Sequence, residues 1–464
     1  MKSRTTGAAG IRFRVSRGDA GASRVLLLAW VGIASLAPVF AQSEEPYEGP
    51  SILSRDSTTA GARGGKLLDF QLWGDITGIV DNGLTAPVLN SSGQVVAQGN
   101  DYGLEIGGGA SGSKSWESDQ IRLDYRGDWR QYTPNNGYNG TDQFLDLQWT
   151  HRLSRHVQLV MHEVGGMTTL SFGPLSYYPL ANSDLLGVPL NDLFDNTAYF
   201  SQSTAELIWQ KSARLSFSFG GDDFLVRRKS ALLVNTDGYR GRADMAYRWT
   251  MRQTVSVSYA YEHFDYPRSY GFSDINMAEG GWSWGLGPRT DFGIDGGAAR
   301  VVTLGLIQVP LDPVIAAILG ESYTVTTAKR DVIIPVGEAR FSRRFASSAL
   351  GISGGMTVQP GDGIYLTSRM ISGAASYSYV GGKRLTFAMT GGYSRMTTAG
   401  EQTIAPYGGF YGGAGTTWRL FADAHMEARY DYRQYNIRSV ANKAENRVSL
   451  GLAISTGERP LAIW

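Results

Sequence analysis

The sequence predicts an all-β protein, an antiparallel, up-and-down transmembrane β-barrel of about 18 strands, with a range of about 16 to 20. Three observations predict this fold class. Apolar and polar residues alternate with a period of two from near residue 67 to near residue 455, short turns recur at regular intervals, and aromatic residues gather toward strand ends. Successive side chains of a strand point to opposite faces, so this pattern indicates a wall with lipid outside and water inside.

The alternation is clearest in residues 121–130. The odd positions are Ile121, Leu123, Tyr125, Gly127 and Trp129, and the even positions are Arg122, Asp124, Arg126, Asp128 and Arg130. Two further segments carry rows of charge, namely Arg240, Arg242, Asp244 and Arg248, and Asp423, Glu427, Arg429, Asp431 and Arg433. We expect these charged residues to line a water-filled pore, where groups on neighbouring strands can pair. Two roles stay open, a transverse field that orients polar solutes and a purely structural bracing of a hydrated wall.

The N-terminal region predicts a secretory signal peptide over residues 1–41. Arg-rich residues precede an apolar run at residues 25–33, and small residues lie before Gln42, where cleavage is expected. The alternative is an uncleaved membrane anchor, but Ser35 and Pro38 interrupt the run before it could span a bilayer. Residues 42–66 are polar and predict a flexible periplasmic segment, and residues 67–464 predict the barrel.

Short turns are expected along one end of the barrel. They lie near residues 112–114, 154–155, 212–213, 251–252, 287–289, 346–347, 381–383 and 420–421. Most are about 35 to 41 residues apart, a length that fits two tall strands and one outer loop. With a strand before the first turn and another after the last, they give the predicted strand number and place both ends of the barrel on the same side.

Aromatic residues near strand ends are expected to form two girdles at the depth of the lipid headgroups, because amphipathic rings prefer that interface. They are Trp73, Trp129, Trp149, Trp249, Tyr259, Tyr261 and Trp418. The main rival is a soluble β-sandwich or propeller. Strands in those folds are shorter, and they have no reason to carry so many aromatic residues on an outward face.

The signal peptide, the long alternating strands, the short turns and the terminal Trp464 together resemble the porin-like outer-membrane β-barrels of Gram-negative bacteria. The resemblance is architectural and covers roughly residues 67 to 464. It implies a location in the cell outer membrane, contact with outer-membrane lipid and assembly by the barrel-insertion machinery, and it leaves a homo-oligomer open. In this class the last strand commonly ends in an aromatic residue, whereas here residues 457–460 follow the last clear strand before Trp464.

Composition and motifs offer no site for catalysis, a metal or a cofactor. The formal net charge of +1 gives no electrostatic case for nucleic acid, and the absence of Cys removes thiolate chemistry. Residues 107–112 match a dinucleotide glycine pattern and residues 351–355 match a nucleophile elbow, but no helical pattern follows either. The histidines show no metal-ligand spacing. We therefore expect no enzyme, no catalytic residue, no metal and no cofactor.

Two long insertions are the predicted gating loops. The first covers residues 172–201, and its acidic residues Asp184, Asp192 and Asp195 could fold inward and narrow the pore.

The second insertion covers about residues 301–335 and predicts a short helix. Asp312 can cap it, Pro313 suits its first turn, and Ile315 and Leu319 lie within an apolar run. Because this helix is apolar nearly all round, we expect it to be buried as a plug in the lumen, against a partner, or in an outer loop folded on itself.

The function expected from these features is passive, porin-like passage of small polar solutes through a water-filled pore. The first alternative is an outer-membrane component of an exopolysaccharide or other export system, which aromatic residues lining the lumen would favour. The second alternative is a structural or enzymatic barrel without an open channel.

Overall fold

The computed structural model describes residues 69–82, 99–133, 139–169, 197–231, 233–267, 269–310, 323–361, 366–379, 384–399, 406–421, 423–437 and 442–456. The predicted signal peptide, the predicted periplasmic segment and Trp464 lie outside the described residues. No helix within these ranges is long and apolar enough to cross a membrane.

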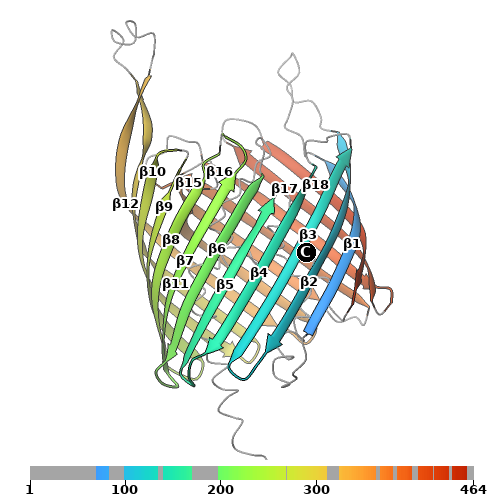
Figure 1. The fold of residues 1–464 in the computed structure, drawn as a ribbon, viewed down its shortest axis with the longest axis horizontal. Coiled ribbons are helices and arrows are strands. Elements are labelled where there is room, and N and C mark those ends of the chain that lie inside the picture. The colour runs from blue at the N-terminus through green and yellow to red at the C-terminus, as the bar shows by residue number, and fades with distance from the viewer. Residues whose placement is uncertain are drawn as a thin grey trace, which may run out of the picture.

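The described part of the chain forms one closed, 18-stranded antiparallel sheet (Figure 1). Each strand pairs with the next along the chain, and β1 pairs with β18, so the sheet closes on itself. The predicted fold class is confirmed. The strands are β1 (Asp69–Asn82), β2 (Asn100–Ser115), β3 (Asp119–Thr133), β4 (Gly140–Arg152), β5 (Val157–Thr168), β6 (Ala198–Gln210), β7 (Leu215–Arg228), β8 (Thr236–Arg248), β9 (Gln253–Asp265), β10 (Gly271–Gly287), β11 (Thr290–Pro310), β12 (Tyr323–Arg344), β13 (Ser348–Pro360), β14 (Thr367–Tyr379), β15 (Leu385–Thr398), β16 (Tyr407–Arg419), β17 (Ala424–Ile437) and β18 (Asn442–Ser455).

Short turns connect the strands at one end of the barrel, which we call the turn end; the opposite end is the loop end. The turns near residues 154–155, 212–213, 251–252, 287–289, 346–347 and 420–421 lie between strands as predicted. A side-chain hydroxyl organises some of them. Ser154 Oγ accepts hydrogen bonds from the backbone N–H groups of His156 and Val157 at 3.2 and 3.1 Å, and Ser212 makes the same contacts in its own turn. Such hydroxyls supply the local acceptor that a tight turn needs.

One predicted turn is wrong, and one lies outside the described residues. Residues 112–114 belong to β2, because pairing with β3 continues to the end of both strands, as between Ser113 and Arg122. The chain turns at residues 116–118 instead, where the N–H of Trp116 donates to the carbonyl of Asp119 at 2.7 Å. Small polar residues favour turns, but on a barrel wall they also occupy inward positions of long strands. Residues 381–383 lie outside the described residues.

The two faces of the wall differ in chemistry as the alternation predicts. On β18 the outward Leu450, Leu452 and Ile454 are at least half exposed, whereas the inward Arg447 is buried. Exposed apolar side chains around a whole closed sheet are the surface that lipid covers in a membrane barrel. The outward aromatic residues include Trp129 and Trp418, both about half exposed.

Trp73 contradicts the predicted outer girdle. It is buried on the inner face and packs against Ala453. Its ring lies over Gly109 on β2, where an added Cβ would meet ring atoms at 2.6 Å. The missing side chain of that glycine leaves the space that the inward indole fills.

The second predicted insertion is largely strand. β11 and β12 pair without interruption from Thr290 and Arg343 up to Pro310 and Tyr323. Residues 301–310 and 323–335 are therefore not a loop, and Figure 1 shows the two strands rising above the ends of their neighbours. Residues 198–201 of the first insertion likewise begin β6. The gating residues themselves lie outside the described residues, namely Asp184, Asp192, Asp195, Asp312, Pro313, Ile315 and Leu319.

The apolar core lies on the inner face at the loop end of β7 to β15. β12 stays paired with β13 only from Arg344 and Ala349 to Gly337 and Met356. Beyond that point β13 and β14 pack over the inner faces of the preceding strands, and a Cβ at Gly305 on β11 would lie 2.7 Å from Leu366. The residues that form this core are Phe224, Ala260, Phe264, Tyr266, Ile275, Met277, Ala299, Val301, Ile334, Val336, Val358 and Ala399.

Candidate functional site

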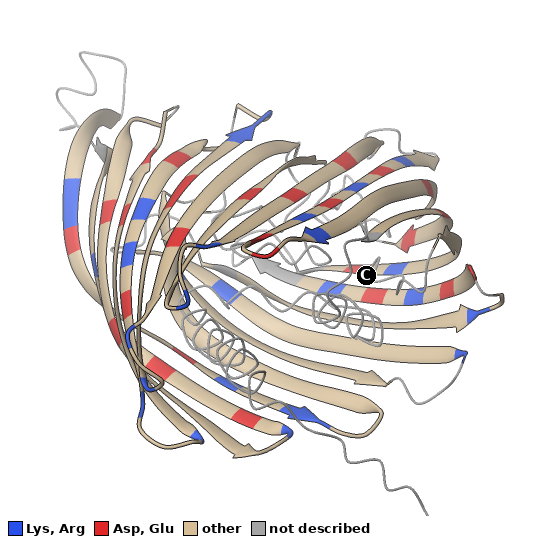
Figure 2. Cartoon of the chain, turned by 60° about the horizontal axis from the view of Figure 1, so that its bottom comes forward, with Lys and Arg blue, Asp and Glu red and all other residues tan. Residues whose placement is uncertain are grey.

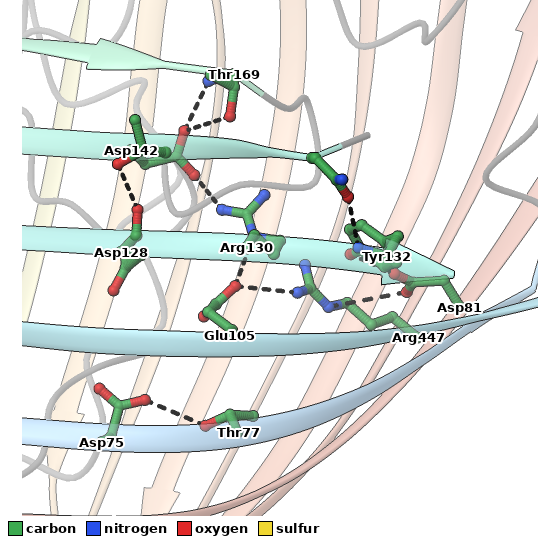
Figure 3. Close-up of polar contacts among 12 residues, drawn as sticks. Asp75, Thr77, Asp81, Glu105, Asp128, Arg130, Tyr132, Asp142, Thr169 and Arg447 are labelled. Carbon is green, nitrogen blue, oxygen red and sulfur yellow. Dashed lines mark hydrogen bonds and ion pairs between the residues drawn. The ribbon is translucent and has the colours of Figure 1, made fainter. Parts of the chain in front are cut away.

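The inner face of β1 to β4 and β18 holds a buried ion-pair network (Figure 3), which we call the Arg130 network: Asp81, Glu105, Arg130, Asp142 and Arg447. Arg130 on β3 is fully buried and lies between two acidic strands. Its Nε donates to Glu105 on β2 at 2.6 Å, and its Nη2 donates to Asp142 on β4. Burial of an arginine is tolerated here because carboxylates on both sides compensate the charge.

Arg447 extends the network to the strands that close the barrel. Its Nη2 lies 3.4 Å from Glu105, and its Nε lies 3.8 Å from Asp81 on β1. The hydroxyl of Tyr132 donates to Asp81 at 2.6 Å, and the ring is fully buried. The network therefore links β18 to β1, β2, β3 and β4 by side chains in addition to the backbone ladder.

A second set of ion pairs lies on β6 to β9. Arg240 on β8 is buried and lies 2.7 Å from Asp222 on β7 and 3.5 Å from Glu262 on β9. Arg242 lies 2.9 Å from Glu206, two strands away on β6. Gly220 lies opposite Arg242 on β7, and its missing side chain leaves room for the arginine to cross that strand.

The predicted lining residues fall mainly on the inner face. Arg126 donates to Asp124 at 2.9 Å, and Arg429 donates to Asp431 at 2.6 Å, each within its own strand. Arg122 and Arg248 lie on the same face near the turn end. The other lining residues placed on this face are Asp128, Arg130, Arg240, Arg242, Asp244, Glu427 and Arg433.

Asp423 does not lie on the inner face of a strand. It lies in the turn before β17, and its backbone carbonyl accepts a hydrogen bond from the N–H of Ser455 at 2.9 Å. The row of alternating charge therefore begins inside β17 rather than at Asp423.

Sequence reasoning missed the acidic partners of the central arginines. Glu105, Asp142 and Asp222 each lie within ion-pair distance of an arginine that was predicted. These partners lie on strands where charge does not alternate over several residues. Their positions depend on strand register, which one sequence does not reveal, although each occupies the polar phase of its strand.

The described residues hold no group of three or more His, Asp or Glu side chains arranged to bind a metal ion. Three histidines are paired with carboxylates on the wall: His151 with Asp119 at 2.7 Å, His162 with Asp146 at 3.0 Å, and His263 with Asp274 at 2.7 Å. The dinucleotide-like residues 107–112 lie within β2, and the elbow-like residues 351–355 lie within β13. Neither segment has the strand-to-helix turn that its motif requires.

Charged residues of both signs recur along many strands, as the blue and red bands of Figure 2 show. Opposite charges facing one another across neighbouring strands create local fields that orient water and polar solutes. The geometry suits binding and passage of polar groups along a wall more than covalent chemistry at one point.

No family model and no curated protein matches the chain. The solved structures that the chain resembles in fold include three Pseudomonas proteins. OpdQ of Pseudomonas aeruginosa is 12% identical, with 84% of this chain and 98% of that chain covered and a TM-score of 0.39. OccK2 (OpdF) of the same species is 14% identical, with 84% and 98% covered and a TM-score of 0.43. A BenF-like porin of Pseudomonas fluorescens Pf-5 is 11% identical, with 84% and 100% covered and a TM-score of 0.42.

Proposed function

We propose that this protein is an outer-membrane pore through which small polar solutes pass passively. The observation that carries the proposal is the division of faces around a closed 18-stranded sheet: apolar side chains are exposed outside, and ion-paired charges line the inside. A closed sheet leaves no unpaired edge in lipid, so a barrel can span a membrane. Barrels of about 16 to 18 strands are wide enough to hold an aqueous channel.

The partners follow from this placement. Outer-membrane lipid contacts the exposed apolar face, and small polar solutes contact the charged inner face. We further propose that the barrel-insertion machinery assembles the protein, because a closed antiparallel barrel that follows the predicted signal peptide needs a route into the membrane from the periplasmic side. A homo-oligomer is compatible with the exposed outer face.

Four inward aromatic rings give the export alternative no support. Aromatic rings point inward at Phe144, Phe200, Phe224 and Phe264, but each is buried. Phe144 packs against Phe200 with ring centroids 6.4 Å apart, and Phe224 packs against Phe264 at 5.3 Å. These rings pack against one another, so they do not present the open faces on which a sugar polymer would stack.

Conductance in planar lipid bilayers tests the pore. Purified full-length protein should give discrete current steps in potassium chloride, and proteoliposomes should swell in isotonic solutions of small sugars but not of large ones. Heat-denatured protein is the control for detergent leaks. Folded protein that inserts, as judged by heat-modifiable migration on gels, but gives neither current nor swelling would contradict the proposal.

A further inference from the structure

Three neighbouring strands carry inward carboxylates and no inward base. β9 and β10 contain no Lys or Arg, and the one arginine of β11, Arg300, lies on the outer face, where it pairs with Asp331 at 2.6 Å. Their inner faces carry Glu262, Glu279 and Asp295. The inward charges that these three strands themselves carry are therefore all negative. Arg240 of β8 pairs with Glu262, and the guanidinium of Arg340 on β12 crosses β11 over Gly293.

The opposite wall also holds carboxylates that form no ion pair with an arginine. β1 contains no Lys or Arg, and its inward Asp75 is 6% exposed, with an Oδ1 atom that has no hydrogen-bond partner. Glu427 on β17 is 5% exposed, and its Oε1 atom also has no partner. In a ring of 18 strands β1 and β10 are as far apart as two strands can be, so Asp75 lies on the wall opposite Glu279.

Glycines bring the acidic groups of β1, β3 and β17 toward one another. Asp75 and Asp128 lie on either side of Gly107, and an added Cβ there would meet Oδ1 of both carboxylates. Gly451 lies between Thr77 and Glu427 in the next register row. Carboxylates of three strands therefore lie close together on this wall.

The central arginines are already committed to other carboxylates. Arg130 contacts Glu105 and Asp142, and Arg240 contacts Asp222 and Glu262. Arg447 contacts Glu105 and Asp81. Within the described residues, these ion pairs do not include four remaining groups, which we call the four carboxylates: Asp75, Glu279, Asp295 and Glu427. Arg340 crosses the wall at Gly293, two residues from Asp295, and Arg429, two residues from Glu427, pairs with Asp431.

We propose that the lumen selects for cations, and that the four carboxylates supply the field that does so. This inference rests on the proposed pore and adds to it the charge class of the solute. Negative charge on both walls of a low-dielectric channel raises the local concentration of cations and lowers that of anions. The donors are spread along the walls and do not surround one point, which suits passage of cations rather than retention of one ion.

The test is the reversal potential of the wild-type protein in a planar bilayer with a gradient of potassium chloride. We expect a permeability ratio of potassium to chloride of at least about 3, because a lumen potential of one kT changes the cation-to-anion ratio roughly sevenfold. Swelling rates with a cationic and an anionic amino acid of equal size should differ in the same direction. A potassium-to-chloride permeability ratio at or below one overturns the inference. Current steps observed in the same experiment would still support the proposed pore. Absence of any conductance overturns both.

Neutralising variants assign the effect to named residues. The combined variant Asp75→Asn, Glu279→Gln, Asp295→Asn and Glu427→Gln should bring the permeability ratio close to one with conductance retained. The matched control is Asp331→Asn, which removes a carboxylate from the outer face and should leave the ratio unchanged. If the combined variant does not fold, the pairs Asp75→Asn with Glu427→Gln and Glu279→Gln with Asp295→Asn each test one wall. Cation selectivity that survives both pairs would overturn the assignment to the four carboxylates.

Discussion

Ser273 Oγ on β10 lies 2.5 Å from Thr367 Oγ1 at the start of β14, although β11, β12 and β13 separate the two strands in the sheet. The hydroxyl of Tyr266, just after β9, lies 2.9 Å from the same Thr367 oxygen. Burial raises the pKa of Tyr266, so its hydroxyl stays protonated and remains a donor. The loop end of β14 therefore lies against the inner face of β9 and β10, where it covers the apolar core.

Replacing Thr367 by Val should destabilise this inward packing by about 1 to 3 kcal/mol, because the substitution leaves the buried hydroxyls of Tyr266 and Ser273 without a shared partner. Urea unfolding of the protein in lipid vesicles, followed by Trp fluorescence, measures the effect. The control is Thr390→Val, since Thr390 makes only an exposed hydrogen bond of 3.3 Å to the carbonyl of Ala375. Equal effects of the two variants would contradict a structural role for the Thr367 contact.

Replacing Arg130 by Met should cost about 3 to 5 kcal/mol, because Glu105 and Asp142 would keep their negative charges without the arginine between them. The matched control is Arg227→Met. Arg227 pairs with Asp237, and both side chains are more than a third exposed, so its loss should cost at most about 1 kcal/mol. Denaturant unfolding in lipid compares the two.

Removing all three charges tests the reason for that cost. The triple variant Glu105→Gln, Arg130→Met and Asp142→Asn should recover much of the stability that Arg130→Met loses, because no uncompensated buried charge remains. A triple variant less stable than the single one would show that the ion pairs themselves, rather than the unpaired carboxylates, dominate the energetics.

Adjacent glycines on β11 should differ in their response to replacement by alanine. An added Cβ at Gly297 would meet the backbone carbonyl oxygen of Ala278 and lie 2.7 Å from the Cα of Glu279, and backbone atoms of a paired strand cannot move aside cheaply. At Gly296 nothing lies within 4 Å. Gly297→Ala should therefore cost about 1 to 3 kcal/mol, and Gly296→Ala should stay within about 0.5 kcal/mol of wild type. The temperature at which each variant loses its heat-modifiable gel migration gives the ranking, and a reversed ranking would contradict the geometry.

The alternation of Ile121 to Arg130 was sufficient to predict the wall, because a strand in a membrane barrel must separate lipid from water at every residue. The ends of the strands were harder to predict. Gly112 and Ser113 have turn propensity but lie within β2. Val301 and Thr303 lie within β11, which is longer than most strands of the barrel. Pairing with a neighbour decides both cases, and pairing is not a local property of the sequence.

The candidate site was predicted only in part, because pairing between strands also decides which charged residues meet. Arg130 and Arg240 stood out because charge alternates around them, but their partners Glu105 and Asp222 lie on other strands. A shift of one residue in register would place those carboxylates on the lipid face, so only the paired structure identifies them. The inward position of Asp75 was harder still to predict, because the inward Trp73 of the same strand breaks the alternation of apolar and polar residues.

Spin labels placed one at a time at residues 121–130 should show a two-residue oscillation in a lipid bilayer. Labels at Ile121, Tyr125 and Trp129 should favour oxygen as the relaxing agent, because these side chains are exposed on the outer face. Labels at Asp124 and Asp128 should show little relaxation by oxygen, because these side chains are buried on the inner face. Continuous-wave saturation measurements supply the comparison, and uniform oxygen contact along the series would rule out the assignment of faces.

The β12 segment at residues 323–336 should exchange its amide hydrogens faster than residues 337–344 of the same strand. The upper segment pairs with β11 alone, whereas the lower one pairs with both β11 and β13. A strand paired on one side leaves alternate N–H groups without a sheet partner, and a two-stranded ribbon opens at low free-energy cost. Hydrogen exchange followed by mass spectrometry resolves the two segments, with β14 as the reference because it pairs with both neighbours along Thr367–Tyr379. Equal protection of the two β12 segments would mean that a further strand or segment covers the upper edge of β12.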